Sequence, residues 1–224
     1  MPKNKTKDIA FIAVMTALIL IFAIVPINIG AVDMAFMPLL AVVVTTQVKG
    51  FKLGLLTGFI FGVVSFAMSF TFRSILSPAF MNPLVSIVPR LIIPVTTYYS
   101  GKLVEKILSY IRLNAKVADS IKYGISGAIG VCTNTFFVLG MIMLWYYGKA
   151  FGSAVIGWAL IGTILATNFA IELAITTALC IPISLATSKF IKIKTPHRYD
   201  IKGDNLVKDK EVITDFFDKE INDK

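Results

Sequence analysis

The sequence predicts an all-α integral membrane protein with six transmembrane helices and both termini in the cytoplasm. Of its 224 residues, 56% are hydrophobic, whereas soluble domains are about 45–50% apolar. The excess lies in long runs, several of which approach the roughly 20 apolar residues that a helix needs to cross a bilayer. Lysine and arginine concentrate in alternate loops and in both tails, which is typical of a multi-pass protein.

Six apolar segments are separated by charged or turn-forming residues. The expected spans are residues 8–26, 34–48, 53–69, 84–104, 121–147 and 154–190. The first segment is basic and then apolar, but it is too long for a signal peptide and lacks a small-residue cleavage site. We therefore expect it to remain as a membrane helix. The second is short and carries Pro38 near its start, which is tolerated at membrane depth where protein buries the segment or where it lines a cavity.

The positive charges define the expected orientation. The loops and tails on the predicted cytoplasmic side carry Lys3, Lys5, Lys7, Lys49, Lys52, Lys102, Lys106, Arg112, Lys116, Lys122, Lys189, Lys192 and Lys194. The opposite side carries only Arg73 and Lys149. Because cytoplasmic loops hold the excess of Lys and Arg, both termini are expected inside a bacterial plasma membrane. The net charge of +9 is then explained by orientation, and no nucleic-acid partner is expected.

The composition changes after Lys194. We expect a six-helix membrane domain over residues 1–194 and a charged cytoplasmic tail over residues 195–224. The tail has one apolar stripe, formed by Val212, Ile213, Phe216, Phe217 and Ile221. That spacing fits a short amphipathic helix on the membrane or on a partner, and a partly disordered tail is the alternative.

Several kinds of chemistry are not indicated. Cys132 and Cys180 lie inside apolar runs without metal or redox spacing, so we expect both to pack in the core. His197 lies in the polar tail. The chain has no Walker-type phosphate loop and no histidine–carboxylate cluster at membrane depth. We therefore expect no enzyme, no cofactor and no metal site. Paired broken helices are also lacking, which argues against a stand-alone secondary transporter.

Arg90 is the most informative residue, because it lies in the apolar run 84–95 between Pro89 and Pro94. A cation at membrane depth costs roughly 2.5–3.5 kcal/mol on insertion scales, so it is expected to face a partner or a cavity. The two prolines predict an irregular helix. One interpretation is that the guanidinium binds an anionic ligand such as a carboxylate. The other is a buried pair with Glu172, which is compatible with ligand binding if Glu172 holds Arg90 in the empty site.

Other polar residues at membrane depth are candidates for the same site. Asn168 and Glu172 are four residues apart and share a helix face, and Asn134 lies in the fifth segment. Helix counting places all three in the outer half of the membrane or near its midplane, with Arg90. For the two asparagines, an interhelical hydrogen bond is the alternative. Nearby aromatic residues such as Phe66 would add apolar walls.

Small residues recur at every fourth position in two segments. Gly54, Gly58 and Gly62 share one helix face, as do Ala13 and Ala17. Close backbone approach across small residues is a main source of helix association in lipid. We expect the glycine face to pack internally, and the alanine pair either to pack internally or to dock another membrane protein.

Residues 7–190 resemble a known family. The carrying features are Ala13-xxx-Ala17, Phe36-Met37-Pro38-Leu39-Leu40, the glycine-rich stretch 54–66, the stretch Phe80-Met81-Asn82-Pro83-Leu84-Val85-Ser86-Ile87-Val88-Pro89-Arg90, and Thr133-Asn134-Thr135 followed by Val138-Leu139-Gly140. With these features the chain resembles the substrate-binding S component of an energy-coupling factor (ECF) vitamin transporter. The stretch from Asn82 to Arg90 is most similar to that of pantothenate-type members.

The resemblance implies a six-helix protein that captures a vitamin outside the cell. It also implies association with a membrane coupling subunit and two cytoplasmic ATPases. Ala13 and Ala17 map onto the first-helix motif that contacts the coupling subunit, and loops 26–33 and 70–83 map onto those that cover the site. The second and third helices are unusually plain, so no aromatic ligand clamp is carried over.

The leading hypothesis is capture of a small carboxylate-bearing vitamin, with pantothenate first. Arg90 would bind the anion, and Asn82, Asn134 and Asn168 would supply hydrogen bonds. An S component for another vitamin, such as riboflavin or folate, is the nearest alternative. An autonomous carrier or channel lined by Arg90 and Glu172 is a second class. A membrane assembly protein with purely structural charges is a third.

Overall fold

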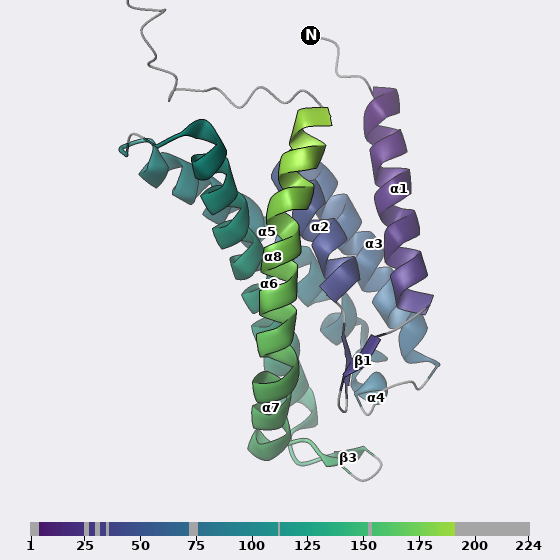
Figure 1. Cartoon of the computed structure of the whole chain (residues 1–224). Helices are drawn as coiled ribbons and strands as arrows, with labels where there is room; N and C mark the ends of the chain where they lie inside the picture. Colours follow the sequence, from purple (N-terminus) through teal and green to yellow (C-terminus); the bar gives the residue numbers. More distant parts are fainter. Residues whose placement is uncertain are drawn as a thin grey trace, which may run out of the picture.

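The computed structural model describes residues 5–24, 27–29, 32–34, 36–71, 76–111, 113–151 and 154–190. Helices account for most of this part of the chain (Figure 1). They are α1 (Lys5–Ile24), α2 (Phe36–Lys49), α3 (Phe51–Ser69), α4 (Ser77–Phe80), α5 (Pro83–Leu108), α6 (Ala115–Tyr146), α7 (Trp158–Ile164), the π-helical turn η1 (Leu165–Phe169) and α8 (Ala170–Phe190). The all-α prediction is confirmed. The charged tail 195–224, with His197, lies outside the described residues.

Two short hairpins interrupt the helices, partly in predicted loops and partly at residue 34 and residues 154–155, which the sequence wrongly assigned to the second and sixth spans. Strands β1 (Ile27–Ile29) and β2 (Val32–Met34) pair antiparallel, as do β3 (Ala150–Phe151) and β4 (Ala154–Val155). Both hairpins lie at the end of the bundle opposite the N-terminus, and α4 lies at the same end (Figure 1). Strands of two or three residues are too short to show an alternating apolar pattern, which is why the sequence did not reveal them.

Four helical stretches are apolar and long enough to cross a membrane. They are Thr6–Ile24, Phe51–Ser69, Ala115–Tyr146 and Trp158–Phe190, and a shorter apolar helix covers Met37–Lys49. The protein is therefore a helical membrane protein. The remaining long helix, α5, has 26 residues but carries Arg90 in its first half and charged residues in its last turns, which lower its hydropathy.

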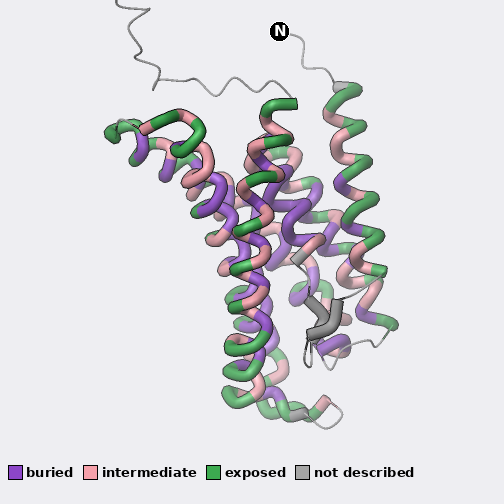
Figure 2. The backbone as a smooth tube through the Cα atoms, in the orientation of Figure 1, coloured by how far each residue is buried: buried purple, intermediate pink, exposed green. Residues whose placement is uncertain are grey.

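The core is centred on α2. From Leu39 to Val44 every side chain of this helix is buried, and Val42 and Val43 are completely enclosed. Buried residues gather at the centre of the bundle, whereas α1 is largely exposed (Figure 2). A helix that is apolar all round is stable only where neighbours surround it, and α2 contacts α1, α3, α5, α6 and α8. The expectation that this short segment is buried in protein is confirmed.

The glycine face of α3 packs internally, as predicted. A Cβ atom added at Gly58 would lie 2.6 Å from the backbone oxygen of Arg90, and one added at Gly62 would lie 3.0 Å from the Cα of Ile87. Gly54 makes a similar close approach to Thr46 of α2. These glycines therefore let the backbones of α3 and α5 meet beside Arg90.

The prolines of α5 do not end the helix. The helix runs without a break from Pro83 to Leu108, with Pro89 and Pro94 inside, although neither proline has a backbone N–H to donate. The ring of Pro94 fits over Gly58, where an added Cβ would be 3.3 Å from it. The irregular turn lies instead in the last long helical stretch, where η1 separates α7 from α8.

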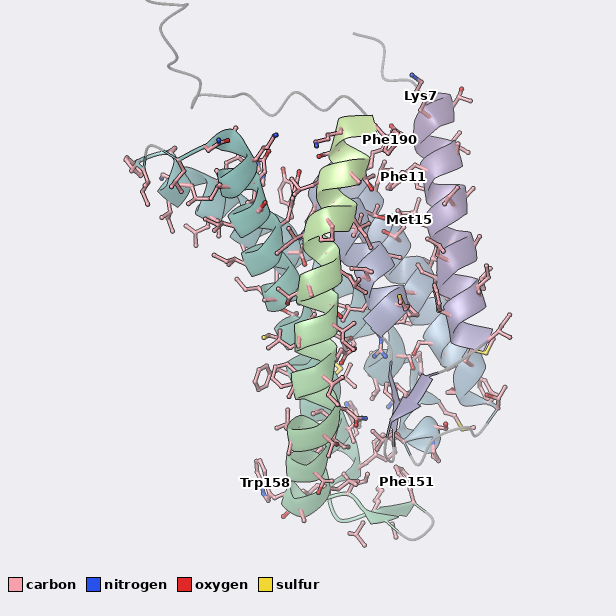
Figure 3. The ribbon with its side chains drawn as sticks, in the orientation of Figure 1. Lys7, Phe11, Met15, Phe151, Trp158 and Phe190 are labelled. Atoms are coloured by element: carbon pink, nitrogen blue, oxygen red, sulfur yellow. The ribbon has the colours of Figure 1, made fainter. Side chains whose placement is uncertain are left out.

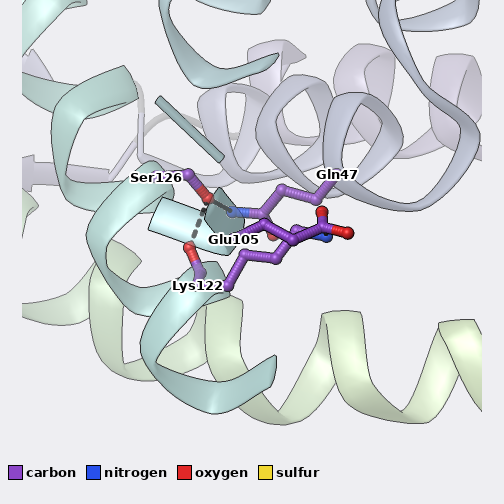
Figure 4. A network of polar contacts seen from close by, with 4 residues as sticks. All are labelled: Gln47, Glu105, Lys122 and Ser126. Atoms are coloured by element: carbon purple, nitrogen blue, oxygen red, sulfur yellow. Dashed lines mark hydrogen bonds and ion pairs between the residues drawn. The ribbon is translucent and has the colours of Figure 1, made fainter. Parts of the chain in front are cut away.

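Gln47, a half-buried glutamine of α2, joins three helices through its hydrogen bonds, and Figure 4 shows its contact with Ser126 of α6. Gln47 of α2 donates to the Tyr123 backbone oxygen and to Ser126 Oγ on α6, both at 2.9 Å. Its Oε1 accepts from Ser184 at 2.6 Å and from Cys180 at 3.1 Å on α8. The NH₂ group and the oxygen of the Gln47 amide therefore each form two hydrogen bonds. The predicted core position of Cys180 is confirmed, whereas Cys132 is only half-buried.

Helix α1 contacts the bundle along one face. Lys49 of α2 forms an ion pair with Asp8 at 2.6 Å and lies 5.3 Å from the ring centre of Phe11. Met15 and Ile19 are buried against the core. Figure 3 shows Phe11 and Met15 directed from α1 toward the other helices.

The predicted alanine pair lies on the opposite face of α1. Ala13 and Ala17 are both exposed, and Val14, Leu18 and Ile21 beside them are also exposed. Of the two interpretations that the sequence left open, internal packing is therefore wrong for this monomer. This face is free to meet lipid or another protein.

Candidate ligand-binding site

The start of α5 fixes the position of Arg90. The Asn82 side chain caps the helix by accepting a hydrogen bond from the Leu84 backbone nitrogen at 3.0 Å, and Pro83 occupies the first helical position. Both residue types are favoured at these positions. At 1.5 Å per residue, Arg90 lies about 10 Å along the axis from Pro83. The predicted ligand hydrogen bond of Asn82 stays a prediction, and its observed role is a helix cap.

Two aromatic rings flank the Arg90 guanidinium. Its central carbon lies 5.3 Å from the ring centre of Phe61 on α3 and 5.0 Å from that of Phe80 on α4. Cation–π attraction is about 2 kcal/mol or more where the cation is desolvated, and Arg90 is only 3% exposed. Phe66, which the sequence suggested as a wall, packs edge-on against Phe70 at 5.2 Å.

The hydrogen bonds of Arg90 leave donor capacity unused. Nη1 donates to the Val85 backbone oxygen at 3.2 Å, and Nη2 donates to Ser65 Oγ at 3.3 Å. The buried Nε has no hydrogen-bond partner. Since a guanidinium carries five N–H donors in a rigid plane, the aromatic rings and these two long bonds orient Arg90 without saturating it.

Glu172 is the opposite charge in this region. It is 8% exposed on α8 and attracts Arg90 electrostatically, with Thr135 of α6 beside its carboxyl group. The ion pairs formed within 4.0 Å by the described residues are Lys49–Asp8 and Lys122–Glu105. Arg90 and Glu172 are thus neighbours whose charged atoms do not touch. The predicted direct pair, in which each side chain satisfies the other, is not formed.

Both asparagines are buried. Asn134 lies next to Thr135 on α6, and Asn168 lies in η1, four residues before Glu172 of α8. Asn134 of α6 is 6% exposed, and its Oδ1 has no hydrogen-bond partner. Asn168 is 7% exposed and its Oδ1 accepts a hydrogen bond from Thr167 at 3.0 Å. Asn168 lies in the η1 turn, and π turns inside α-helices are frequent at functional sites.

These groups make a chemically complementary set. Arg90 Nε is an unpaired buried donor, whereas Glu172 Oε1 and Asn134 Oδ1 are unpaired buried acceptors. Each such group costs about 1–3 kcal/mol when it is left unpaired. A molecule with an anionic acceptor and separate hydroxyl or amide donors would satisfy both kinds. Within the described ranges, no three His, Cys, Asp or Glu side chains are placed to hold a metal ion.

The sequence missed four residues of this region: Phe61, Ser65 and Phe80 around Arg90, and Thr135 beside Glu172. A signal was present for two of them. Phe61 and Ser65 follow Gly58 at three and seven residues, so they continue the glycine face that was expected to pack against another helix. Phe80 lies outside any long apolar segment. Thr135 adjoins Asn134 but carried no signal of its own.

Comparisons with known proteins do not identify the chain. No model of a known protein family matches it, and no curated protein sequence matches it.

Proposed function

We propose that this protein captures a small carboxylate-bearing vitamin at the Arg90 cluster, as the S component of an ECF-type transporter, and that the vitamin is pantothenate. The observation that carries the proposal is the state of Arg90. It is buried, oriented by Phe61 and Phe80, and attracted to Glu172 without contact, and its Nε is unpaired. A planar fork of donors held in this way suits a carboxylate.

The chemistry of the cluster favours pantothenate over the other vitamins considered. Pantothenate has one carboxylate at one end and hydroxyl and amide N–H donors toward the other. The carboxylate would bind Arg90, and the donors would bind Glu172 and Asn134, which are acceptors without partners. Riboflavin lacks the carboxylate. Folate has two, and the second would be repelled by Glu172.

The proposed topology has six spans, formed by α1, α2, α3, α5, α6 and the continuous stretch α7–η1–α8. Both termini lie in the cytoplasm because the cations concentrate at that end. Arg90 then lies near the outer end, where α4 and both hairpins are found (Figure 1). This arrangement would admit the vitamin from outside.

The exposed alanine face of α1 is the proposed contact for the coupling subunit. Replacing Ala13 and Ala17 by leucine would fill the space that lets a partner backbone approach. We expect the double variant Ala13→Leu/Ala17→Leu to lose co-purification with the coupling subunit and ATPases and to keep vitamin binding. Loss of vitamin binding in the isolated variant would instead show that this face supports the fold.

The role of Arg90 is tested by binding of vitamins to the purified chain. We expect Arg90→Ala to weaken pantothenate binding by at least about 30-fold, the lower end for truncating one partner of a buried charge pair. The matched control is Lys149→Ala, which removes a cation outside the cluster. Melting of both variants shows whether they fold.

Each rival function has its own outcome. Unchanged vitamin affinity in a folded Arg90→Ala protein would remove Arg90 from the site. Uptake by the purified chain alone in liposomes, without ATP, would favour an autonomous carrier. Failure to bind any vitamin, together with unfolding of Arg90→Ala, would favour a structural protein.

A further inference from the structure

The last three turns of α5 expose an unusual face. Three large side chains on it are more than half exposed, Tyr99 at 62%, Leu103 at 59% and Ile107 at 52%, and Tyr110, two residues beyond the helix end, is 80% exposed. Lys102 and Lys106 are exposed on the same half of the helix. The opposite half packs against α6 through Val104 and Leu108. We call the exposed surface, which also includes Tyr98, the lysine–tyrosine face.

Aromatic contacts hold this face in place. The Phe51 ring of α3 lies 5.7 Å from that of Tyr98 and 6.4 Å from that of Tyr99, and the two tyrosine rings are 5.6 Å apart. Lys102 Nζ lies 4.6 Å from the ring centre of Tyr98. The cation and the tyrosines thus form one ordered surface.

The charge of the face is positive. Glu105 is the acidic residue of α5, and it forms an ion pair with Lys122 of α6 at 2.7 Å. Glu105 also attracts Lys102, but the two lysines and the pairing of Glu105 with Lys122 leave the exposed half with a net positive charge. A face that combines tyrosines, aliphatic residues and lysines matches the boundary between lipid headgroups and acyl chains.

The helix lengths place the face at that boundary. Helix α6 has 32 residues, about 48 Å at 1.5 Å per residue, whereas the hydrocarbon core is about 30 Å thick. One end of the α5–α6 pair must therefore extend into the headgroups. In Figure 1 the α5–α6 connection lies at the same end of the bundle as the N-terminus, which is the cytoplasmic end in the proposed topology.

We propose that the lysine–tyrosine face binds anionic phospholipids of the cytoplasmic leaflet, with Lys102 and Lys106 on the headgroup phosphates. This inference goes beyond the vitamin-binding function and rests only on the proposed orientation. Anionic lipids attract lysines near the surface with an energy equivalent to about fivefold in affinity per residue. Lys102 lies about 18 Å along α5 from Arg90, and Tyr98, the nearest residue of the face, about 12 Å, so the face is separate from the vitamin site.

The test is native mass spectrometry of the purified full chain with phosphatidylglycerol and phosphatidylcholine of equal acyl length. We expect the protein to prefer phosphatidylglycerol and Lys102→Gln/Lys106→Gln to lose the preference, by about fivefold per lysine. Lys102→Arg/Lys106→Arg should keep it. The control Lys189→Gln removes an exposed cation of α8 at the same end of the bundle. This variant should also keep the preference for phosphatidylglycerol.

Two results would overturn the proposal. One is equal binding of the two lipids by the unmodified protein, which would leave the face to a protein partner or a second copy of the chain. The other is an equal loss of preference in Lys189→Gln, which would mean a general effect of charge. Vitamin binding by the Lys102→Gln/Lys106→Gln protein should be unchanged. A failure of the lipid proposal is therefore distinguishable from a failure of the proposed vitamin-binding function.

Discussion

At the scale of single residues, several interactions stabilise the buried guanidinium of Arg90. Phe61 and Phe80 face its π-system, Val85 and Ser65 accept two of its hydrogen bonds, and Glu172 compensates its charge from a distance. None of these interactions uses Nε. Arg90 is thus stabilised within the fold and keeps one buried donor unused.

Replacing Glu172 by glutamine separates its two roles. Glu172→Gln keeps an acceptor oxygen and removes the charge that compensates Arg90. Removing the charge takes away the attraction on Arg90 and also the cost of burying a carboxylate, so melting of the variant serves only to show that it folds. Affinity for simple carboxylates such as acetate should rise, because Arg90 then lacks its counter-charge. Carboxylate titration measures the effect, and an unchanged affinity for acetate in the folded variant would contradict this electrostatic role.

The sequence revealed the charged residues of the site better than their partners. Arg90 and Glu172 were identifiable because a charge in an apolar run is costly wherever it lies. The distance between Arg90 and Glu172 was not predictable, because it depends on how α5 and α8 pack. The aromatic partners were missed for the same reason, since Phe61 and Phe80 lie on different elements and meet only in the fold.

At the scale of elements, the α3–α5 contact positions the site. The Arg90 backbone oxygen lies where a Gly58 side chain would be, at 2.6 Å from an added Cβ. The position of Arg90 relative to α3 therefore depends on the absence of a side chain at Gly58.

Gly58→Ala tests this dependence. The added methyl must push α5 away, and overpacking of this kind costs about 1–3 kcal/mol. We expect lower thermal stability and weaker vitamin binding, because Arg90 moves with its backbone. The control is Gly140→Ala on α6, where an added Cβ meets nothing within 4 Å. Equal binding by the Gly58→Ala and Gly140→Ala proteins would disprove the positioning role.

The Gln47 cluster makes a different prediction, because it joins α2, α6 and α8 far from Arg90. Gln47→Leu removes the four hydrogen bonds of this side chain, each of which contributes about 0.5–1.5 kcal/mol to stability. We expect a lower melting temperature and unchanged vitamin affinity per folded molecule. Thr163→Ala, which removes an exposed hydroxyl that bonds within its own helix, is the control. A Gln47→Leu protein as stable as the native one would show that the cluster is dispensable.

The elements themselves were largely predictable. Long apolar runs fix where a helix lies, so the predicted segments coincide with the main helices to within a few residues at most ends. The exceptions have physical causes. Polar ends such as 115–120 extend α6 beyond its apolar run, the hairpins are too short to show a pattern, and the η1 turn depends on tertiary packing.

At the scale of the whole molecule, the account is of a bundle with distinct ends. One end holds both hairpins and α4, whose Phe80 contacts Arg90, and the other holds the N-terminus and the α5–α6 connection (Figure 1). Asymmetry of this kind suits a protein that receives a ligand on one side and interacts with lipid and partners on the other. The alanine face of α1 is exposed along its flank.

The central claim is that Arg90 binds the carboxylate of a vitamin. Isothermal titration of the purified protein with pantothenate and with its methyl ester tests it most directly, because the ester differs only in lacking the charge. We expect the acid to bind at least about 30-fold more tightly than the ester, a difference typical of a buried charge pair, and the difference to vanish in Arg90→Ala. Equal binding of the acid and the ester by the native protein would contradict the account.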